Sequence, residues 1–187
     1  MSDAAASIGR RVVVTGLAGA GKSTFTRALA ARTGLPIVYL DLRFWQPGWV
    51  APTEEAWRRE QRRALAGDAW IADGNYRETL ALRLERADTI VVLDTPWPVC
   101  VGRALVRGVR PSGGEMPPGC HDSAWRRMRD EWPLAVRIWR NRHAEPVQER
   151  EIIAEHGQHA TLHVLRSKRD ALALLDGIGC SRAVGDA

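Results

Sequence analysis

Short apolar runs alternate with segments of helical periodicity along the chain. Five runs are predicted strands, namely 11–15, 37–40, 69–72, 89–93 and 162–165. Seven segments have the apolar spacing of helices, namely 22–33, 54–66, 78–86, 97–107, 124–142, 146–156 and 168–175. Strands that alternate with helices are typical of βαβ units, which build a parallel sheet covered by helices. The pattern therefore predicts an α/β fold with a five-stranded parallel sheet flanked by helices.

Residues 108–122 interrupt this alternation. Seven of these residues are glycine or proline, so the segment is predicted to be a loop. The chain shows no internal repeat and no change of composition that marks a second domain. We expect a single domain over 1–187, with a core of about 10–175.

The first predicted strand is followed by a phosphate-binding loop. The motif G-x-x-x-x-G-K-[ST] is matched in full by Gly16, Leu17, Ala18, Gly19, Ala20, Gly21, Lys22, Ser23 and Thr24. Its place between a strand and a helix is the one that the motif requires, because the backbone N–H groups then cradle phosphates at a helix N-terminus. Lys22 is expected to reach the β- and γ-phosphates, and the Ser23 hydroxyl to ligate Mg²⁺. The motif predicts binding of ATP or another nucleoside triphosphate.

Three aspartates follow predicted strands. Asp41 follows 37–40, Asp73 follows 69–72 and Asp94 follows 89–93. The carboxyl ends of parallel strands lie along one edge of a sheet, where ligands bind in α/β proteins. The three carboxylates are therefore expected beside the phosphate loop, at a Mg²⁺ and acceptor site. The alternative is that each aspartate only caps a turn.

Composition limits the class of protein. The 187 residues are 45% apolar, which is typical of a globular domain. No apolar run has the length of a membrane span, and the N-terminus does not resemble a signal peptide, so we expect a cytoplasmic protein without a membrane partner. Cys100, Cys120 and Cys180 are too widely spaced to indicate disulfides or a zinc site.

The formal net charge of +5 has two interpretations. A basic chain can bind DNA through its phosphates, or it can line a site for a small phosphorylated ligand. Of the 27 basic residues, all but Lys22 and Lys168 are arginine. One of the two lysines thus lies in the phosphate loop. The sequence leaves weak DNA binding open.

Several sequence blocks beyond the loop resemble one family. These blocks are Tyr39-Leu40-Asp41, Phe44-Trp45-Gln46-Pro47-Gly48-Trp49, Trp70-Ile71-Ala72-Asp73-Gly74-Asn75-Tyr76, Leu82 to Asp88, and Leu93-Asp94. In this order they are similar to the DNA topology modulation proteins, small P-loop kinases related to adenylate kinase. The resemblance implies a P-loop NTPase fold of the nucleoside and nucleotide kinase type, with a flap at about 42–66 and a small lid at about 108–142. It also implies ATP binding and phosphoryl transfer to a nucleoside- or nucleotide-like acceptor.

The resemblance also implies roles for single residues. Asp73 resembles the aspartate that holds a Mg²⁺-bound water, and Asp41 resembles the one that accepts a proton from an acceptor hydroxyl. Cations that compensate phosphoryl charge are expected on two helices. Arg103 and Arg107 match the arginines that open the lid, whereas Arg137 and Arg140 fall where lid arginines return over the phosphates.

The acceptor side of the resemblance is less defined. Trp45, Asn75, Tyr76 and Arg83 are candidate acceptor contacts, and Lys168 is a candidate neighbour of the adenine. The tryptophans of the flap can instead pack on the core, and a capping box with Asp170 explains Ser167 without any ligand. Two functions follow as hypotheses. The first is an ATP- and Mg²⁺-dependent kinase; the alternative is an ATP-binding regulator associated with DNA that has no small-molecule kinase activity.

Overall fold

The computed structural model describes residues 8–109, 118, 120 and 124–182. Five strands form one parallel sheet: β1 (Arg11–Thr15), β2 (Ile37–Tyr39), β3 (Trp70–Asp73), β4 (Thr89–Leu93) and β5 (Thr161–Leu165). Their spatial order is β2-β3-β1-β4-β5, with every pair of neighbours parallel. The predicted α/β fold with a five-stranded parallel sheet is confirmed.

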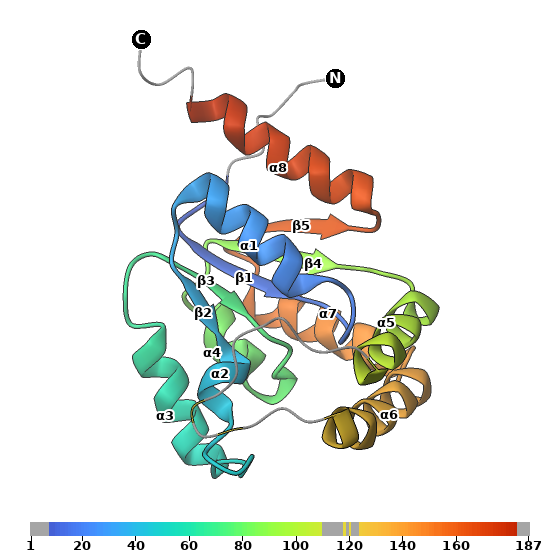
Figure 1. Cartoon of the computed structure of the whole chain (residues 1–187). Helices are drawn as coiled ribbons and strands as arrows, with labels where there is room; N and C mark the ends of the chain where they lie inside the picture. The colour runs from blue at the N-terminus through green and yellow to red at the C-terminus, as the bar shows by residue number, and fades with distance from the viewer. Residues whose placement is uncertain (1–7, 110–117, 119, 121–123, 183–187) are drawn as a thin grey trace.

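Helices cover both faces of the sheet. They are α1 (Lys22–Thr33), α2 (Leu40–Phe44), α3 (Glu54–Ala64), the 3₁₀ turn η1 (Arg77–Thr79), α4 (Leu80–Leu84), α5 (Trp97–Val109), α6 (Ala124–Arg140), α7 (Ala144–His156) and α8 (Lys168–Arg182). Figure 1 shows α1 and α8 on one face and α4 and α7 on the other. Helices α5 and α6 pack against each other beyond the carboxyl ends of the strands.

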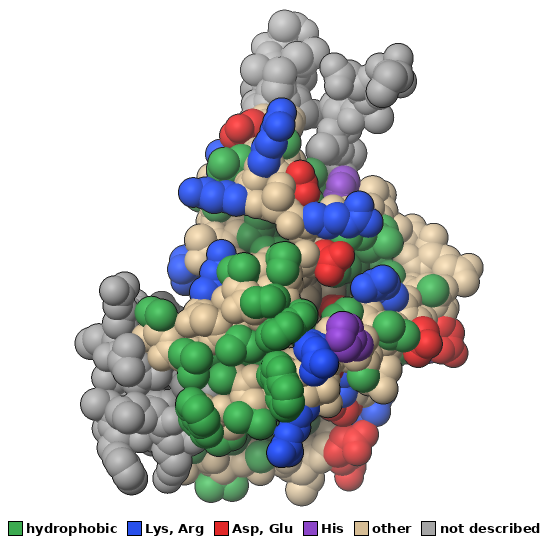
Figure 2. Space-filling view, turned by 90° about the vertical axis from the view of Figure 1, so that its right-hand side faces the viewer, with side chains coloured by type: hydrophobic (Ala, Val, Ile, Leu, Met, Phe, Trp, Pro, Cys, Tyr) green, Lys and Arg blue, Asp and Glu red, His purple; other side chains and the backbone are tan. Residues whose placement is uncertain are grey.

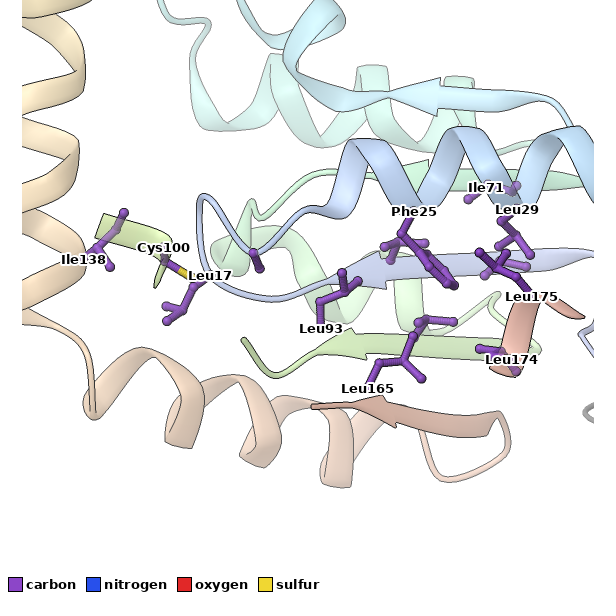
Figure 3. Close-up of a cluster of buried hydrophobic side chains, with 14 of the residues drawn as sticks. Leu17, Phe25, Leu29, Ile71, Leu93, Cys100, Ile138, Leu165, Leu174 and Leu175 are labelled. Atoms are coloured by element: carbon purple, nitrogen blue, oxygen red, sulfur yellow. The ribbon is translucent and has the colours of Figure 1, made fainter. Parts of the chain in front are cut away.

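Two apolar clusters lie on the two faces of the sheet. Val12 and Val14 of β1 point to the cluster under α1 and α8, in which Phe25 and Leu29 are buried (Figure 3). Val13 points to the opposite cluster, under α3, α4 and α7. Because alternate residues of a strand face opposite sides, a central strand buried on both faces must be apolar throughout. This is why the run at 11–15 is the clearest strand in the sequence.

Charged side chains are distributed over the surface. On the face shown in Figure 2, Lys and Arg side chains lie among acidic and apolar ones. On α3, Arg58 pairs with Glu54, and Arg63 pairs with Glu60. Within the described part of the chain, no helix has both the length and the apolar character needed to cross a membrane.

Helix α2 is the main difference from the predicted elements. The sequence predicted a strand up to residue 40, but the chain turns into a helix at Leu40. Leu40 is fully buried over Gly74, where an added Cβ would lie 2.8 Å from the Leu40 Cβ. Leu40 is thus packed against Gly74 as the first residue of α2, and no short-range sequence pattern predicts this contact.

Other boundaries shift by a few residues. The predicted helix 78–86 is η1 followed by α4, α6 ends at Arg140, and α8 continues to Arg182. Of the predicted loop 108–122, residues 110–117, 119, 121 and 122 lie outside the described residues. The predicted lid thus falls partly outside them, and its described part is the end of α5, Pro118, Cys120 and α6.

Candidate active site

A large cleft opens at the carboxyl ends of the strands. Its volume is about 1540 Å³, and it is lined by the phosphate loop, α2, the segment after β3, and parts of α5, α6 and α7. Pockets for one small ligand usually measure about 300–1,000 Å³. The cleft therefore has room for a nucleotide and a second small molecule side by side.

Close packing fixes the backbone of the phosphate loop. Gly16 has a φ of 129°, and a Cβ at this position would lie 2.5 Å from the Leu93 carbonyl oxygen at the end of β4. Gly19 has a φ of 83°, and a Cβ there would lie 2.6 Å from the Cys100 carbonyl oxygen in α5. Only glycine fits these two positions, because both the left-handed φ and the close approach exclude a side chain.

Lys22 folds back over the loop at the start of α1. Its ammonium donates to the carbonyl oxygens of Gly16 (2.9 Å) and Leu17 (3.0 Å). Burial lowers the pKa of Lys22, and the negative charges of Asp73, Asp41 and Glu149 oppose this shift. A phosphate in the loop can replace the two carbonyls as the partner of the ammonium.

Ser23 and Asp73 supply a pair of oxygen ligands. Asp73 ends β3 and is buried, and its carboxylate accepts a hydrogen bond from the Ser23 hydroxyl. Burial raises the pKa of Asp73. Among the described residues, no group of three or more His, Cys, Asp or Glu can hold a metal ion by itself. Two oxygen donors fit Mg²⁺, which usually takes one or two protein ligands and completes its shell with phosphates and water.

Asp41 and Tyr76 form a hydrogen-bonded pair in the cleft lining. Asp41 lies in the first turn of α2, and its Oδ1 accepts a bond of 2.8 Å from the Tyr76 hydroxyl. Burial and the charge of Asp41 raise the pKa of Tyr76, so the phenol stays a neutral donor. One carboxylate oxygen of Asp41 is thus held in place, and the other can accept a hydrogen bond from a ligand.

Tyr76 of this pair also belongs to an aromatic cluster. It consists of Phe44, Trp45, Trp49 and Tyr76, all of which line the cleft. Ring centroids lie 4.7 Å apart for Phe44 and Tyr76, and 5.7 Å apart for Trp45 and Trp49. Trp57, the third tryptophan of the predicted flap, is buried behind the cluster and packs on Phe44 and Tyr76. The cluster gives this part of the cleft an aromatic lining.

Three of the four predicted lid arginines line the cleft. Arg103 donates from Nη1 to the carbonyl oxygens of Gly19 (3.0 Å) and Ala20 (3.2 Å), so it lies directly against the phosphate loop. Arg107 and Arg137 line the same cleft from α5 and α6. Arg140 is exposed at the end of α6, outside the lining residues.

Arg83 does not fit the direct acceptor contact predicted from the sequence. Its side chain is 1% exposed and is absent from the cleft lining. Its Nη1 donates to the Tyr76 carbonyl (3.1 Å), the Gln61 Oε1 (3.1 Å) and the Thr79 Oγ1 (3.3 Å). The guanidinium therefore braces the backbone behind Tyr76 instead of facing the ligand.

Two further predicted residues lie away from the cleft lining. Asp94, the third strand-end aspartate, lies 3.9 Å from the Arg166 Nε. Lys168 is the first residue of α8, and the capping box before it is confirmed: the Asp170 N–H donates to the Ser167 Oγ at 3.1 Å, and the Ser167 N–H donates to the Asp170 Oδ2 at 3.0 Å. Contact of Lys168 with adenine stays a prediction.

Asn75, in contrast, lines the cleft beside Tyr76.

Glu149 is a cleft residue that the sequence analysis missed. It comes from α7, is 7% exposed, and accepts hydrogen bonds from the Thr15 hydroxyl and the Gly16 N–H. Burial raises the pKa of Glu149. Glu145, one helical turn earlier, also lines the cleft. Acids four residues apart share one helix face, but such a pair is common on exposed helices and did not indicate a site.

Comparison with solved structures shows the fold of small P-loop kinases. Shikimate kinase from Acinetobacter baumannii, solved with shikimate, matches with a TM-score of 0.53, 18% identity and 95% of each chain covered. Shikimate kinase from Bacteroides thetaiotaomicron matches with a TM-score of 0.51, 17% identity, and 93% of this chain and 98% of that chain covered. A putative kinase from Chloroflexus aurantiacus matches with a TM-score of 0.53 and 16% identity, and the match covers 95% of this chain and 98% of that chain. No protein-family model and no curated protein sequence matches the chain.

The position of Arg83 predicts a loss of stability when it is replaced. We expect Arg83→Ala to lower the free energy of unfolding by about 2 kcal/mol, because it leaves the buried Gln61 Oε1 without its donor. The Tyr76 carbonyl loses one of its donors but still accepts from Thr79. Arg77→Ala removes a cation from the cleft lining and should stay within about 0.5 kcal/mol of the wild type. Urea denaturation measures both changes. Equal stability of the two variants would contradict the bracing role.

The burial of Glu149 predicts that replacing it by glutamine changes the stability of the protein by an amount that depends on pH. A buried carboxylate with a raised pKa costs folding free energy when ionised, and this cost disappears as the pH falls through the raised pKa toward 4.5. The free energy of unfolding of Glu149→Gln minus that of the wild type should therefore be larger at pH 8 than at pH 4.5. Denaturation at a series of pH values measures this difference. Glu151→Gln, exposed on the same helix, is the control. A gap that does not change with pH would show that ionisation of Glu149 is not involved.

Proposed function

We propose that the protein transfers the γ-phosphoryl group of ATP, in the presence of Mg²⁺, to a hydroxyl group of a small nucleoside- or nucleotide-like acceptor. The observation that carries this proposal is the arrangement of one cleft. The phosphate loop and the hydrogen-bonded pair Asp41 and Tyr76 line the same cleft. The kinase fold of the structural neighbours supports it.

On the donor side, the chain supplies positive charge and N–H groups. The phosphate loop holds the phosphates at the N-terminus of α1, and Lys22 exchanges its carbonyl partners for phosphate oxygens. Arg103, already against the loop, compensates charge on the transferred group together with Arg107 and Arg137. Ser23 and Asp73 would hold Mg²⁺, which would supply positive charge to offset the charge of the phosphates.

On the acceptor side, Asp41 orients the nucleophile. Its free carboxylate oxygen accepts the hydrogen bond of the acceptor hydroxyl, while Tyr76 fixes the other oxygen. The acceptor oxygen forms a bond to the γ-phosphorus as the bond from that phosphorus to the bridging oxygen of ADP breaks. The hydroxyl proton passes to Asp41. Phosphoryl transfer depends on position and charge more than on a strong base, so a carboxylate is sufficient.

The finer assignments from the sequence belong to the same proposal. The flap at about 42–66 and the lid at about 108–142 would close over both substrates and exclude water, which limits hydrolysis of ATP. We assign the activity to the cytoplasm and the chain to the relatives of adenylate kinase called DNA topology modulation proteins. The cluster of acceptor residues in the cleft favours a kinase over the alternative, an ATP-binding regulator associated with DNA.

Removal of the loop lysine tests the donor site. Lys22→Ala should weaken binding of ATP with Mg²⁺ at least about 10-fold, because the ammonium is the point charge that meets the terminal phosphates. Arg32→Ala removes a cation from the other end of α1, where it pairs with Asp176, and should bind ATP like the wild type. Isothermal titration calorimetry measures both affinities. Wild-type affinity in Lys22→Ala would overturn the phosphate-loop assignment.

Replacement of Asp41 tests the acceptor site. Asp41→Asn should lower kcat about 100-fold or more with little change in ATP affinity, because a primary amide cannot take the hydroxyl proton. A radiolabelled-ATP assay against nucleosides, nucleotides and polynucleotide ends identifies the acceptor and then measures the variant. Transfer by Asp41→Asn at the wild-type rate would refute its role. Steeply salt-dependent binding to duplex DNA, without phosphorylation of any acceptor, would favour the regulator.

A further inference from the structure

Charge is distributed unevenly over the cleft lining. On the phosphate loop and helices α1, α5, α6 and α7, the lining holds four cations, Lys22, Arg103, Arg107 and Arg137, against two acids, Glu145 and Glu149. In the described segment from Asp41 to Glu78, the lining holds three acids, Asp41, Asp73 and Glu78, against one cation, Arg77. Asp73 is assigned to the Mg²⁺ site, so Asp41 and Glu78 face the acceptor with Arg77. The acceptor end therefore offers little net attraction to an anion.

Other arginines near this segment are directed elsewhere. Arg43 pairs with Glu60 (2.9 Å), Arg58 pairs with Glu54 (2.9 Å), and the Arg83 side chain is buried behind Tyr76. None of these three cations belongs to the cleft lining. Of the arginines between residues 41 and 78, Arg77 alone belongs to the described cleft lining. Glutamates of α3 pair with Arg43 and Arg58 outside that lining.

The aromatic cluster, like the acids, disfavours an anionic ligand. The face of an aromatic ring is electronegative, so Phe44, Trp45, Trp49 and Tyr76 attract ring C–H groups and cations and repel anions. Gly48 and Trp49 adopt left-handed φ values of 75° and 67° in the tight turn closed by the Gln46–Val50 bridge. A left-handed φ is costly for tryptophan, and this turn holds Trp49 in the cleft lining beside Trp45.

We propose that the acceptor is a ring compound that carries a free hydroxyl and no phosphate or carboxylate group. This inference rests on the proposed kinase function and narrows its acceptor. Aromatic faces bind the ring, Asp41 binds the hydroxyl, and the carboxylates of Asp41 and Glu78 tolerate an uncharged or an amine-bearing acceptor. A nucleoside or an amino sugar has this chemistry; a nucleoside monophosphate or a carboxylated ring such as shikimate does not.

Matched acceptor pairs test the inference. Adenosine with AMP, thymidine with TMP, and glucosamine with glucosamine 6-phosphate differ only by a phosphate, and shikimate adds a carboxylated ring. We expect kcat/KM, measured by ADP release from the full chain, to be at least 10-fold higher for the unphosphorylated member of the preferred pair. A preference for the phosphorylated member or for shikimate would overturn the inference and leave the kinase proposal standing.

A binding measurement separates the two proposals. The acceptors are titrated by tryptophan fluorescence quenching with the donor site filled by a non-hydrolysable ATP analogue and Mg²⁺, so that nucleotides cannot occupy the phosphate loop. The unphosphorylated members should again bind at least 10-fold more tightly. If none of the compounds is phosphorylated, the kinase proposal fails, while the ranking of affinities still decides the inference about the acceptor end.

A charge reversal tests the cause of the preference. Glu78→Arg places a second cation beside Arg77 and should reduce the preference for the unphosphorylated member at least threefold. Glu55→Arg makes the same change on α3, where Glu55 pairs with Arg59 outside the cleft lining, and should leave the preference unchanged. An unchanged preference in Glu78→Arg, or an equal loss in both variants, would contradict the charge argument.

Discussion

Close packing of the phosphate loop against the end of β4 and the start of α5 is the constraint on which the site depends. Gly16 lies against the Leu93 carbonyl and Gly19 against the Cys100 carbonyl, so the loop has one available backbone path. That path turns Lys22 back onto the loop carbonyls and brings the Ser23 hydroxyl to Asp73 at the end of β3. Arg103 approaches the loop from α5, the same helix that confines Gly19.

A second, polar network supports Asp41 and Tyr76 in the cleft lining. Arg83 and Gln61 are buried and hydrogen-bonded to each other, and Arg83 also binds the Tyr76 carbonyl. Tyr76 in turn fixes Asp41. A carboxylate that must meet a hydroxyl within a few tenths of an ångström needs such support, because an unsupported side chain samples several rotamers. The buried arginine thus contributes to the site through the geometry of other residues.

Sequence reasoning located the residues whose chemistry is carried by local pattern. The apolar run of β1, the glycines of the loop and the aspartates after β2 and β3 all have short-range signals, and their places in the fold agree with those signals. Arg83 and Glu149 have no such signal, and Asp94 has the same signal as Asp41 and Asp73 but lies outside the cleft lining. A basic residue within a short helix, an acid after a strand and an acid on an amphipathic helix look the same whether they face a ligand, a neighbour or water.

The sequence by itself determined the α/β fold, the phosphate loop and the strand edge at which the site lies, because periodicity of 2 and 3.6 residues and glycine spacing are properties of neighbouring positions. Tertiary structure decided which charges share the cleft. Glu149 meets the loop only because α7 packs below β1, and Arg83 is turned inward because α3 supplies Gln61. Long-range packing sets these contacts, since the partners lie far apart along the chain and their pairing depends on how whole elements are buried.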